Sequence, residues 1–373
     1  MLKKSLASWV TRSWYQGNVL LSALRPLALF FQYLSLYRKK RLSSSAWLPP
    51  IPTIIVGNIT VGGTGKTPVV IHLAKFLQTH GLQPIILSRG YGGKYQGCVV
   101  VTAGDQAETV GDEPLLLKQQ SGAAVVIGRS RVAAAKFALR NIKAQPSDLY
   151  QDPRVFICDD GLQHYHLGRH TEIAVIDAAR LFGNQRLLPE GPLREPLARL
   201  AEVDMILLHG DKHCMQLHQH MPTLPSKKIY TMHMIPTGFC AAGADKTDGS
   251  GEQLTHLTVQ QFQQQFGYHI KAVAATGNPS RFFISLQQLG FHLDVYEFPD
   301  HHLFARTELT HIQQNKQKHL PVVMTSKDAV KCQKWRLKHY WYLQIRTEIE
   351  GDFMQNLLDS VKKRMECSYK AEL

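Results

Sequence analysis

The segment "VGNITVGGTGKTPVV", residues 56–70, constrains the fold of this chain more than any other. It overlaps an apolar run, "TIIVGN", that is typical of a buried strand, and it leads into "KTPVVIHLAKFLQTHG", which has the spacing of a helix ended by Gly81. A glycine-rich turn between a strand and a helix presents backbone N–H groups to a phosphate with no side chain in the way. The segment therefore predicts a nucleotide-binding P-loop.

Within this loop, Lys66 is expected to reach the β and γ phosphates, and the Thr67 hydroxyl to ligate Mg²⁺. The strict motif has glycine where this chain has Thr60. The double glycine resembles the variant loop of ATPases that partition plasmids and place division sites, whose extra lysine falls at Val61 here. We expect ATP and Mg²⁺ as cofactors, with nucleotide bound by Thr60, Val61, Gly62, Gly63, Thr64, Gly65, Lys66 and Thr67.

Short apolar runs alternate with helical stretches after the loop, which indicates an α/β fold with a parallel sheet covered on both faces. The composition then shifts to Gly, Asp, Ser and Thr before a smaller α/β unit, and "HYWYLQIRTEIE" alternates like a strand that can pair with "KIYTMHMIP" as a ribbon. We expect a P-loop domain at 44–228, a linker strand and loop at 229–268, a smaller α/β domain at 269–338, and a return strand with a C-terminal helix at 339–373.

Residues 1–43 form a basic arm. The net charge of the chain is +14 and its first acidic residue is Asp105, whereas the arm carries eight Lys and Arg around an aromatic-rich apolar stretch. This pattern is typical of a helix lying in an anionic membrane face. Because Arg25 and Pro26 interrupt the stretch, an interfacial anchor is favoured over a spanning helix. A helix buried in the soluble domain is the remaining alternative.

Several polar stretches are candidates for catalysis. Asp159 and Asp160 end the apolar run "RVFICDDG", where P-loop enzymes place a metal-side acid; a solvated strand end is the alternative. Taken alone, Asp112 of "GDEP" is more typical of a helix cap. In "FPDHHLF", His301 lies beside Asp300, so it suits acid–base chemistry and a hydrogen-bonded surface turn equally well. Further candidates for anion contacts are Arg194, Thr325, Lys327 and Asp328.

Together and in this order, these stretches resemble the tetraacyldisaccharide 4′-kinases, the lipid A 4′-kinases of Gram-negative bacteria. The matching stretches are "GNITVGGTGKTP", "LSRGYGG", "GDEP", "CDDGLQHYHL", "VIDAARLFGNQRLLPEGPLREP", "FPDHH" and "TSKDAVK", and they extend over nearly the whole chain. The resemblance implies a two-domain fold whose cleft closes on ATP. It also implies transfer of the γ-phosphate to the 4′-hydroxyl of a tetraacylated glucosamine disaccharide 1-phosphate, giving lipid IVA, at the cytoplasmic face of the inner membrane.

Carried over to the matching positions, the resemblance implies that Asp112 and His301 are the acid–base pair, which replaces the helix-cap interpretation of Asp112. The expected catalytic residues are Asp112, His301, Lys66, Asp159 and Asp160; the expected metal ligands are Thr67, Asp159 and Glu113. The expected substrate-binding or site-shaping residues are Arg89, Gln163, His164, Arg194, Glu195, Lys327 and Asp328. The expected partners are the lipid substrate and anionic inner-membrane lipids, with no nucleic acid and no obligate protein partner.

Three rival functions predict other features. A membrane-recruited ATPase switch of the partitioning type predicts a lysine at position 61, which is valine here. A nucleic-acid-binding ATPase predicts basic residues spread over the domain surface rather than gathered in the arm. A P-loop kinase acting on a small soluble molecule would not need the arm.

Overall fold

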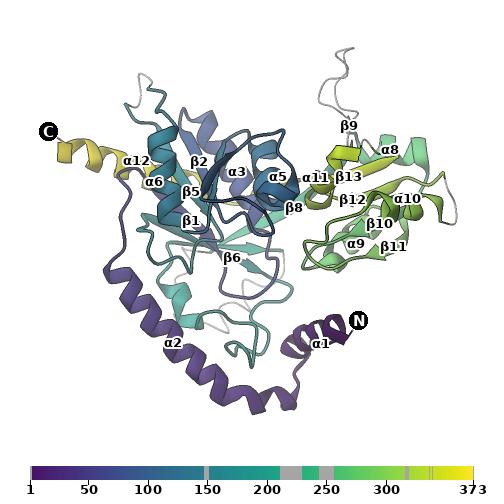
Figure 1. Cartoon of the computed structure of the whole chain (residues 1–373), viewed down its shortest axis with the longest axis horizontal. Helices are drawn as coiled ribbons and strands as arrows, with labels where there is room; N and C mark the ends of the chain where they lie inside the picture. Colours follow the sequence, from purple (N-terminus) through teal and green to yellow (C-terminus); the bar gives the residue numbers. More distant parts are fainter. Residues whose placement is uncertain are drawn as a thin grey trace.

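The computed structural model describes residues 2–146, 151–210, 229–242, 256–315, 319–335, 337 and 339–372. Within these residues, thirteen strands join one mixed, mostly parallel sheet, and helices cover both of its faces (Figure 1). The predicted α/β class is therefore confirmed. The sheet has two parts, which we call the P-loop half (residues 51–210) and the distal half (residues 256–337).

The P-loop half contains the strands nearest the nucleotide loop. Their order across the sheet is β7 (Met205–His209), β6 (Thr171–Asp177), β1 (Thr53–Gly57), β5 (Arg154–Asp159), β2 (Gln83–Ser88), β4 (Ala124–Gly128) and β3 (Cys98–Val101). Only the β3–β4 pairing is antiparallel among these neighbours. The carboxyl ends of the parallel strands therefore lie along one edge, where ligands bind in open α/β sheets.

Helices pack on both faces of this half because its central strands are buried on both sides. The helices α3 (Lys66–Thr79), α5 (Asp112–Ser121) and α12 (Phe353–Glu372) share one hydrophobic core, and α6 (Arg131–Asn141) contributes to the other. Alternate residues of β1 divide between the two cores: Ile54 and Val56 enter the first, and Ile55 enters the second. This alternation fixes the register of β1 against its neighbouring strands, and the P-loop that follows β1 therefore lies at the sheet edge.

The distal half is a smaller α/β layer. Its strands β11 (His292–Glu297), β10 (His269–Ala274) and β12 (Val322–Thr325) are parallel. The helices α8 (Val259–Phe266) and α9 (Pro279–Gln288) pack on one face, and α10 (Arg306–Gln314) and α11 (Ser326–Cys332) pack on the other.

The short elements of the P-loop half are α4 (Ala107–Val110) and the 3₁₀ turn η2 (Leu197–Ala201). Those of the distal half are β9 (His256–Leu257) and the 3₁₀ turn η4 (Gln333–Trp335).

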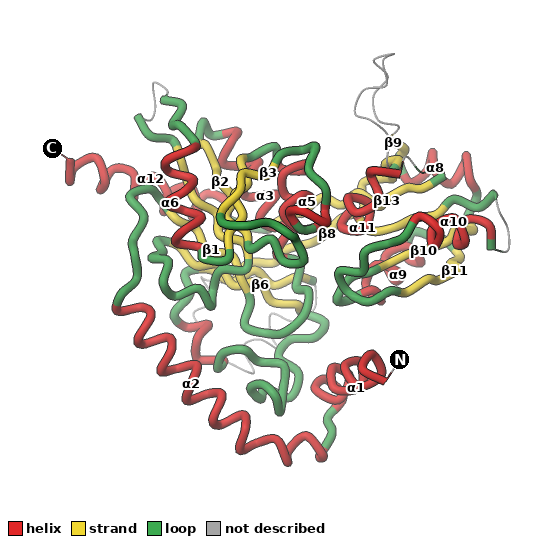
Figure 2. The backbone as a smooth tube through the Cα atoms, in the orientation of Figure 1, coloured by secondary structure: helices red, strands yellow, loops and turns green. Residues whose placement is uncertain are grey.

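A long antiparallel ribbon carries the sheet from one half to the other. It consists of β8 (Ile229–Ala241) and β13 (Tyr340–Ile349), which pair from Trp341–Ala241 to Ile349–Met232 (Figure 2). At its edges β8 runs parallel to β7, and β13 runs parallel to β12. The predicted pairing of these two segments is confirmed. Residues 243–255, which were expected to form the linker loop, lie outside the described residues.

The basic arm folds as α1 (Leu2–Gln16), the 3₁₀ turn η1 (Val19–Leu24) and α2 (Arg25–Ser44). Pro26 lies in the first turn of α2 and does not interrupt the helical segment. By length and composition alone, the helical segment Val19–Ser44 is long and apolar enough to cross a membrane. An interfacial anchor, which the sequence favours, stays a prediction. Large apolar side chains along the segment are exposed, among them Leu27, Phe30 and Leu34, which argues against a helix buried in the soluble domain.

Several contacts of the arm with the P-loop half are made to one loop, residues 183–196. Trp14 Nε1 donates to the Pro189 carbonyl at 3.1 Å, and the Asn184 N–H donates to the Trp14 carbonyl at 2.9 Å. Arg25 forms an ion pair with Glu190 at 3.3 Å in the same loop. The arm therefore has a defined position beside the sheet edge that carries the P-loop.

Candidate active site

The backbone of the P-loop adopts conformations that favour glycine. Gly62 and Gly65 have φ of +110° and +94°, and Gly65 caps α3. A Cβ atom on Gly65 would lie 2.3 Å from the Met234 methyl group, whereas a Cβ on Gly63 would meet nothing within 4 Å. The Gly63 backbone is thus open to a ligand, as phosphate binding at a helix start requires.

Lys66 is held by groups that a phosphate could replace. Its Nζ donates to Asn58 Oδ1 at 3.2 Å and lies 3.2 Å from Asp160 Oδ1. Arg194 Nη1 lies 3.4 Å from the other oxygen of Asp160. Although burial opposes its ionisation, the charges of Lys66 and Arg194 hold the pKa of Asp160 at about 2. Asp160 is therefore an ionised carboxylate that gathers two cations beside the P-loop.

The loop at residues 183–196 also supports the P-loop from the side. The Val61 N–H donates to the Pro192 carbonyl at 2.8 Å, and the Arg194 N–H donates to the Ile59 carbonyl at 2.7 Å. Gln163 donates to the Asn58 carbonyl at 3.0 Å and to buried Glu195 at 2.5 Å. Gln163 and Glu195 are thus placed to shape the loop.

Asp159 ends β5 beneath this cluster. Its backbone carbonyl accepts from Arg131 Nη2 at 2.8 Å, and its side chain is buried. Burial, together with the negative charges of Glu113 and Asp160, raises the pKa of Asp159 to about 7. Carboxylates that repel one another in this way would be stabilised by a cation.

The residues expected to hold Mg²⁺ have suitable chemistry. In the described part of the chain, no group of three or more His, Cys, Asp or Glu is arranged to hold a metal by itself. Magnesium in phosphotransfer sites usually takes one or two carboxylates, water and substrate phosphates. The oxygen donors Thr67, Asp159 and Glu113 fit that mode, because Thr67 follows the P-loop lysine and the charge of Glu113 acts on Asp159.

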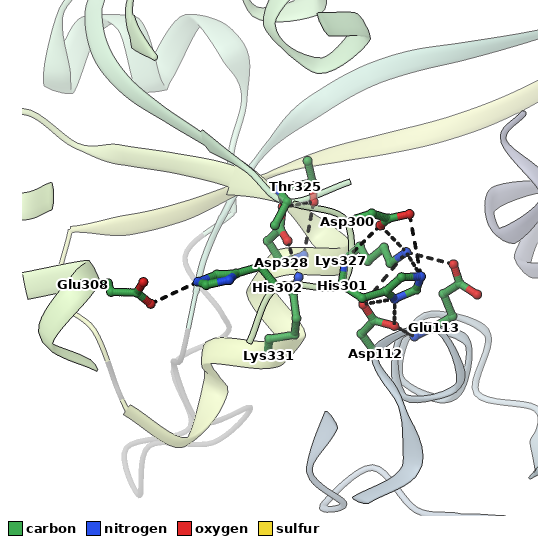
Figure 3. A network of polar contacts seen from close by, with 11 residues as sticks. Asp112, Glu113, Asp300, His301, His302, Glu308, Thr325, Lys327, Asp328 and Lys331 are labelled. Carbon is green, nitrogen blue, oxygen red and sulfur yellow. Dashed lines mark hydrogen bonds and ion pairs between the residues drawn. The ribbon is translucent and has the colours of Figure 1, made fainter. Parts of the chain in front are cut away.

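Asp112 and His301 meet across the two halves of the sheet (Figure 3). Asp112 begins α5, and His301 lies in the turn after β11 with φ of +58°. His301 Nδ1 lies 3.1 and 3.0 Å from the two oxygens of Asp112. The helix expected at Asp112 forms, but Gly111 is its N-cap, and Asp112 Oδ1 accepts from the adjacent Glu113 N–H at 2.8 Å in addition to its contact with His301.

Lys327 joins the same contact from the distal half. Its Nζ lies 2.9 Å from Glu113 Oε1, 3.2 Å from Asp300 Oδ1 and 3.9 Å from Asp112 Oδ2 (Figure 3). Although burial opposes ionisation, the hydrogen bond from His301 and the charge of Lys327 lower the pKa of Asp112. Burial likewise opposes the His301 cation, but its hydrogen bond to Asp112 raises the pKa of His301. The pair is therefore a carboxylate beside a readily protonated imidazole.

Two glycine-rich turns pack together to place these groups. A Cβ on Gly93 would lie 2.6 Å from the Thr109 carbonyl oxygen, and a Cβ on Gly111 would lie 2.8 Å from the Tyr91 carbonyl oxygen. "SRGYGG" and "GDEP" are thus two sides of one close backbone contact. It brings the Tyr91 ring to 4.9 Å from the His301 ring, centroid to centroid.

Comparison with known proteins identifies the family. The family model described as "Tetraacyldisaccharide-1-P 4′-kinase" matches residues 20–362. The chain belongs to the tetraacyldisaccharide-1-P 4′-kinase family. Its activity is that of a tetraacyldisaccharide 4′-kinase of lipid A biosynthesis, as expected from the resemblance.

Relatives of this kinase align over nearly their full lengths. The chain is 37% identical to "Tetraacyldisaccharide 4′-kinase" of Shewanella amazonensis, over 96% of this chain and 97% of the relative. The chain is 38% identical to the protein of the same name from Methylobacillus flagellatus, over 97% of this chain and 98% of the relative. Among solved structures, LpxK from Aquifex aeolicus in complex with ATP superposes with a TM-score of 0.71 and 25% identity, over 93% of this chain and all of the other.

Some predicted residues of the kinase lie in the site, and others lie behind it. The Arg89 side chain is exposed. Burial and Arg131 lower the pKa of His164 to about 4, which leaves its ring neutral. Asp328 is fully buried and accepts from the Ala275 N–H at 3.0 Å, so it shapes the β10–α9 loop. His302 faces Glu308 at 3.1 Å instead of the P-loop half.

Sequence reasoning missed several groups at this edge of the sheet. Asn58 directly follows β1, and Tyr91 lies inside "SRGYGG", so both were within motifs already singled out. Arg131 and Arg281 had no such signal, because each acts through a contact with a distant segment.

Proposed function

We propose that this kinase transfers the γ-phosphate of ATP to the 4′-hydroxyl of tetraacyldisaccharide 1-phosphate, giving lipid IVA, with Asp112 as the general base. The observation that carries the assignment of the base is the 3.0 Å contact between Asp112 and His301. A sugar hydroxyl is a weak nucleophile and needs a positioned base. ATP as donor is supported by the open P-loop backbone and by the relative solved with ATP.

The chain's own residues supply positioning and charge. As the hydroxyl oxygen bonds to the γ-phosphorus and the β–γ bridge bond breaks, Asp112 accepts the hydroxyl proton. Lys66 exchanges its contact with Asp160 for a contact with a phosphate oxygen. Arg194, which also pairs with Asp160, lies close enough to Lys66's partner to add positive charge at the phosphates. His301 orients the carboxylate of Asp112. When bound by Thr67, Asp159 and Glu113, Mg²⁺ would neutralise phosphate charge.

We also propose that the kinase acts at the cytoplasmic face of the inner membrane, where the basic arm contacts anionic lipids. The arm exposes apolar side chains along η1 and α2. It also carries basic residues at the end of α2, including Arg41 in the last turn. Such a helix binds a membrane through its apolar area and its positive charge. The lipid's acyl chains can then stay in the bilayer while its sugar enters the site.

A lipid-labelling assay tests the reaction. Purified full-length protein, radiolabelled ATP, Mg²⁺ and tetraacyldisaccharide 1-phosphate in detergent micelles should yield labelled lipid, and Asp112→Ala should remove the label. Hydrolysis of ATP by the wild type without any labelled lipid would refute the proposed transfer. Chelation of divalent cations should stop labelling, and restoring Mg²⁺ should recover it.

A further inference from the structure

Arg281, in the first turn of α9, connects the distal half to the P-loop half on a second side of the nucleotide loop. Its Nη2 donates to Asp177 Oδ1 at 2.6 Å, and its Nη1 lies 2.8 Å from His209 Nδ1. Asp177 ends β6 and His209 ends β7. One side chain of the distal half therefore contacts the carboxyl ends of two strands in the other half.

The chemistry of this contact favours a fixed geometry. Asp177 and His209 are buried, whereas the Arg281 side chain is 31% exposed. Burial and the charge of Arg281 lower the pKa of His209 to about 4, so its Nδ1 is an acceptor for the guanidinium. A guanidinium that donates to two acceptors at once, one of them a carboxylate, is strongly oriented.

Arg281 also lies next to the P-loop. A Cβ on Gly65 would be 3.3 Å from His209 Nδ1, so the acceptor of Arg281 touches the loop that starts α3. The loop that leads into α9 contains Gly277, where a Cβ would lie 3.7 Å from the Gly63 nitrogen and 3.1 Å from Asp300 Oδ2. The start of α9 is thus held directly opposite the open backbone of Gly63.

We propose that Arg281 is a positioning residue that holds the β10–α9 loop over the P-loop. The arrangement of the two halves that binds nucleotide is then the same arrangement in which His301 contacts Asp112. His301 and Lys327 connect the distal half to α5, and Arg281 connects it to the ends of β6 and β7. With both contacts in place, rotation about the β8–β13 ribbon is restrained. This inference rests on the proposed use of ATP at the P-loop.

Loss of Arg281 should therefore change nucleotide affinity more than the chemical step. When the binding-competent arrangement is less populated, the apparent Kd rises by the same factor, while saturating ligand restores that arrangement. We expect Arg281→Gln to raise the KM for ATP about tenfold and to lower kcat less than about threefold. Asp177→Asn should raise the KM in the same direction, and the double variant should be no worse than Arg281→Gln alone, because both substitutions remove the contact between Arg281 and Asp177.

The experiment measures lipid labelling against ATP concentration for the full-length protein and these variants, with melting temperatures recorded for each. Arg346→Gln is the matched control, since Arg346 is an exposed arginine that pairs with Glu348 on its own strand. An unchanged KM in Arg281→Gln, a lower melting temperature as its only effect, or multiplied effects in the double variant would overturn the inference. A wild type that never labels the lipid would instead refute the proposed reaction.

A second variant tests the loop without touching Arg281. Gly277→Val places side-chain atoms between the Gly63 nitrogen and Asp300. If Arg281 holds this loop over the nucleotide, Gly277→Val should also raise the KM for ATP, by tenfold or more, in protein that melts like the wild type. An unchanged KM would show that the loop does not cover the nucleotide, and the inference would fail.

Discussion

His301 and Asp112 lie 189 positions apart in the chain and come from different halves of the sheet, yet Nδ1 of one and Oδ2 of the other are 3.0 Å apart. Because His301 follows β11 and Asp112 begins α5, the contact exists only when the two halves adopt this arrangement. Lys327 strengthens it by contacting Glu113, the residue after Asp112. The proposed base is therefore prepared by the approach of the distal half.

Asp112→Asn should lower kcat for lipid phosphorylation by about 10²–10⁴, because the amide keeps the shape of the side chain but cannot accept the proton. The KM for ATP should change little, since Asp112 is not part of the P-loop and the asparagine oxygen can still accept from His301, which keeps the two halves in contact. Steady-state lipid labelling measures both values. Asp105→Asn is the control: Asp105 accepts from the Thr102 N–H in a turn before α4, and its loss should leave kcat unchanged. Wild-type kcat in Asp112→Asn would rule out this base.

The contact between His301 and Asp112 should also make stability depend on pH. The pKa of His301 is raised in the fold, so its contribution is complete below its unfolded pKa of about 6.5 and is lost as pH rises through the folded value. The pKa of Asp112 is lowered, so its contribution persists above its unfolded value of about 3.9. His301→Gln should therefore lower the melting temperature more at pH 6 than at pH 9. An equal drop in melting temperature at pH 6 and pH 9 would contradict a charged pair of His301 and Asp112.

The sequence was informative wherever a motif is local, and less so where a role depends on distant partners. The strand, glycine turn and Lys66 of the P-loop are contiguous, and the alternating pattern of residues 339–350 predicts a strand that can pair with the segment of β8, as it does. By contrast, spacing alone made Asp112 a helix cap, because its partner His301 is distant in the chain. Arg281 left no pattern at all, since its acceptors end two separate strands.

Asp328 provides a prediction in which stability, and not substrate binding, should change first. Its Oδ1 lies 2.6 Å from Lys331 Nζ, and both side chains are almost fully buried. Removing one partner of a buried ion pair leaves the other charge uncompensated, which typically costs about 3–5 kcal/mol. Asp328→Ala should lower the free energy of unfolding by about that amount in denaturant titrations. Asp328→Asn, which keeps an acceptor for the Ala275 N–H, should lose less.

Gly63 should be required for nucleotide binding but not for folding. A Cβ there would meet nothing within 4 Å, so Gly63→Val should leave the melting temperature unchanged. The valine methyl groups would nevertheless occupy the space where a phosphate approaches the backbone, so the KM for ATP should rise at least tenfold. Gly104→Val is a matched control, because a Cβ at Gly104 also meets nothing within 4 Å and lies in a turn away from the P-loop. Equal KM values for ATP in the two variants would contradict the prediction that a phosphate contacts the Gly63 backbone.

Exposed apolar side chains on α2 should determine membrane binding by the kinase. Phe30 and Leu34 are four residues apart on one helix face and are 64% and 49% exposed. Burying each in a bilayer is worth about 1.5–3 kcal/mol, so replacing both with serine should lower partition into anionic vesicles at least tenfold. Val295→Ser with Ile284→Ser is the control, because these exposed apolar residues lie in the distal half. Vesicle sedimentation compares the pairs, and equal binding by both would place the membrane contact outside α2.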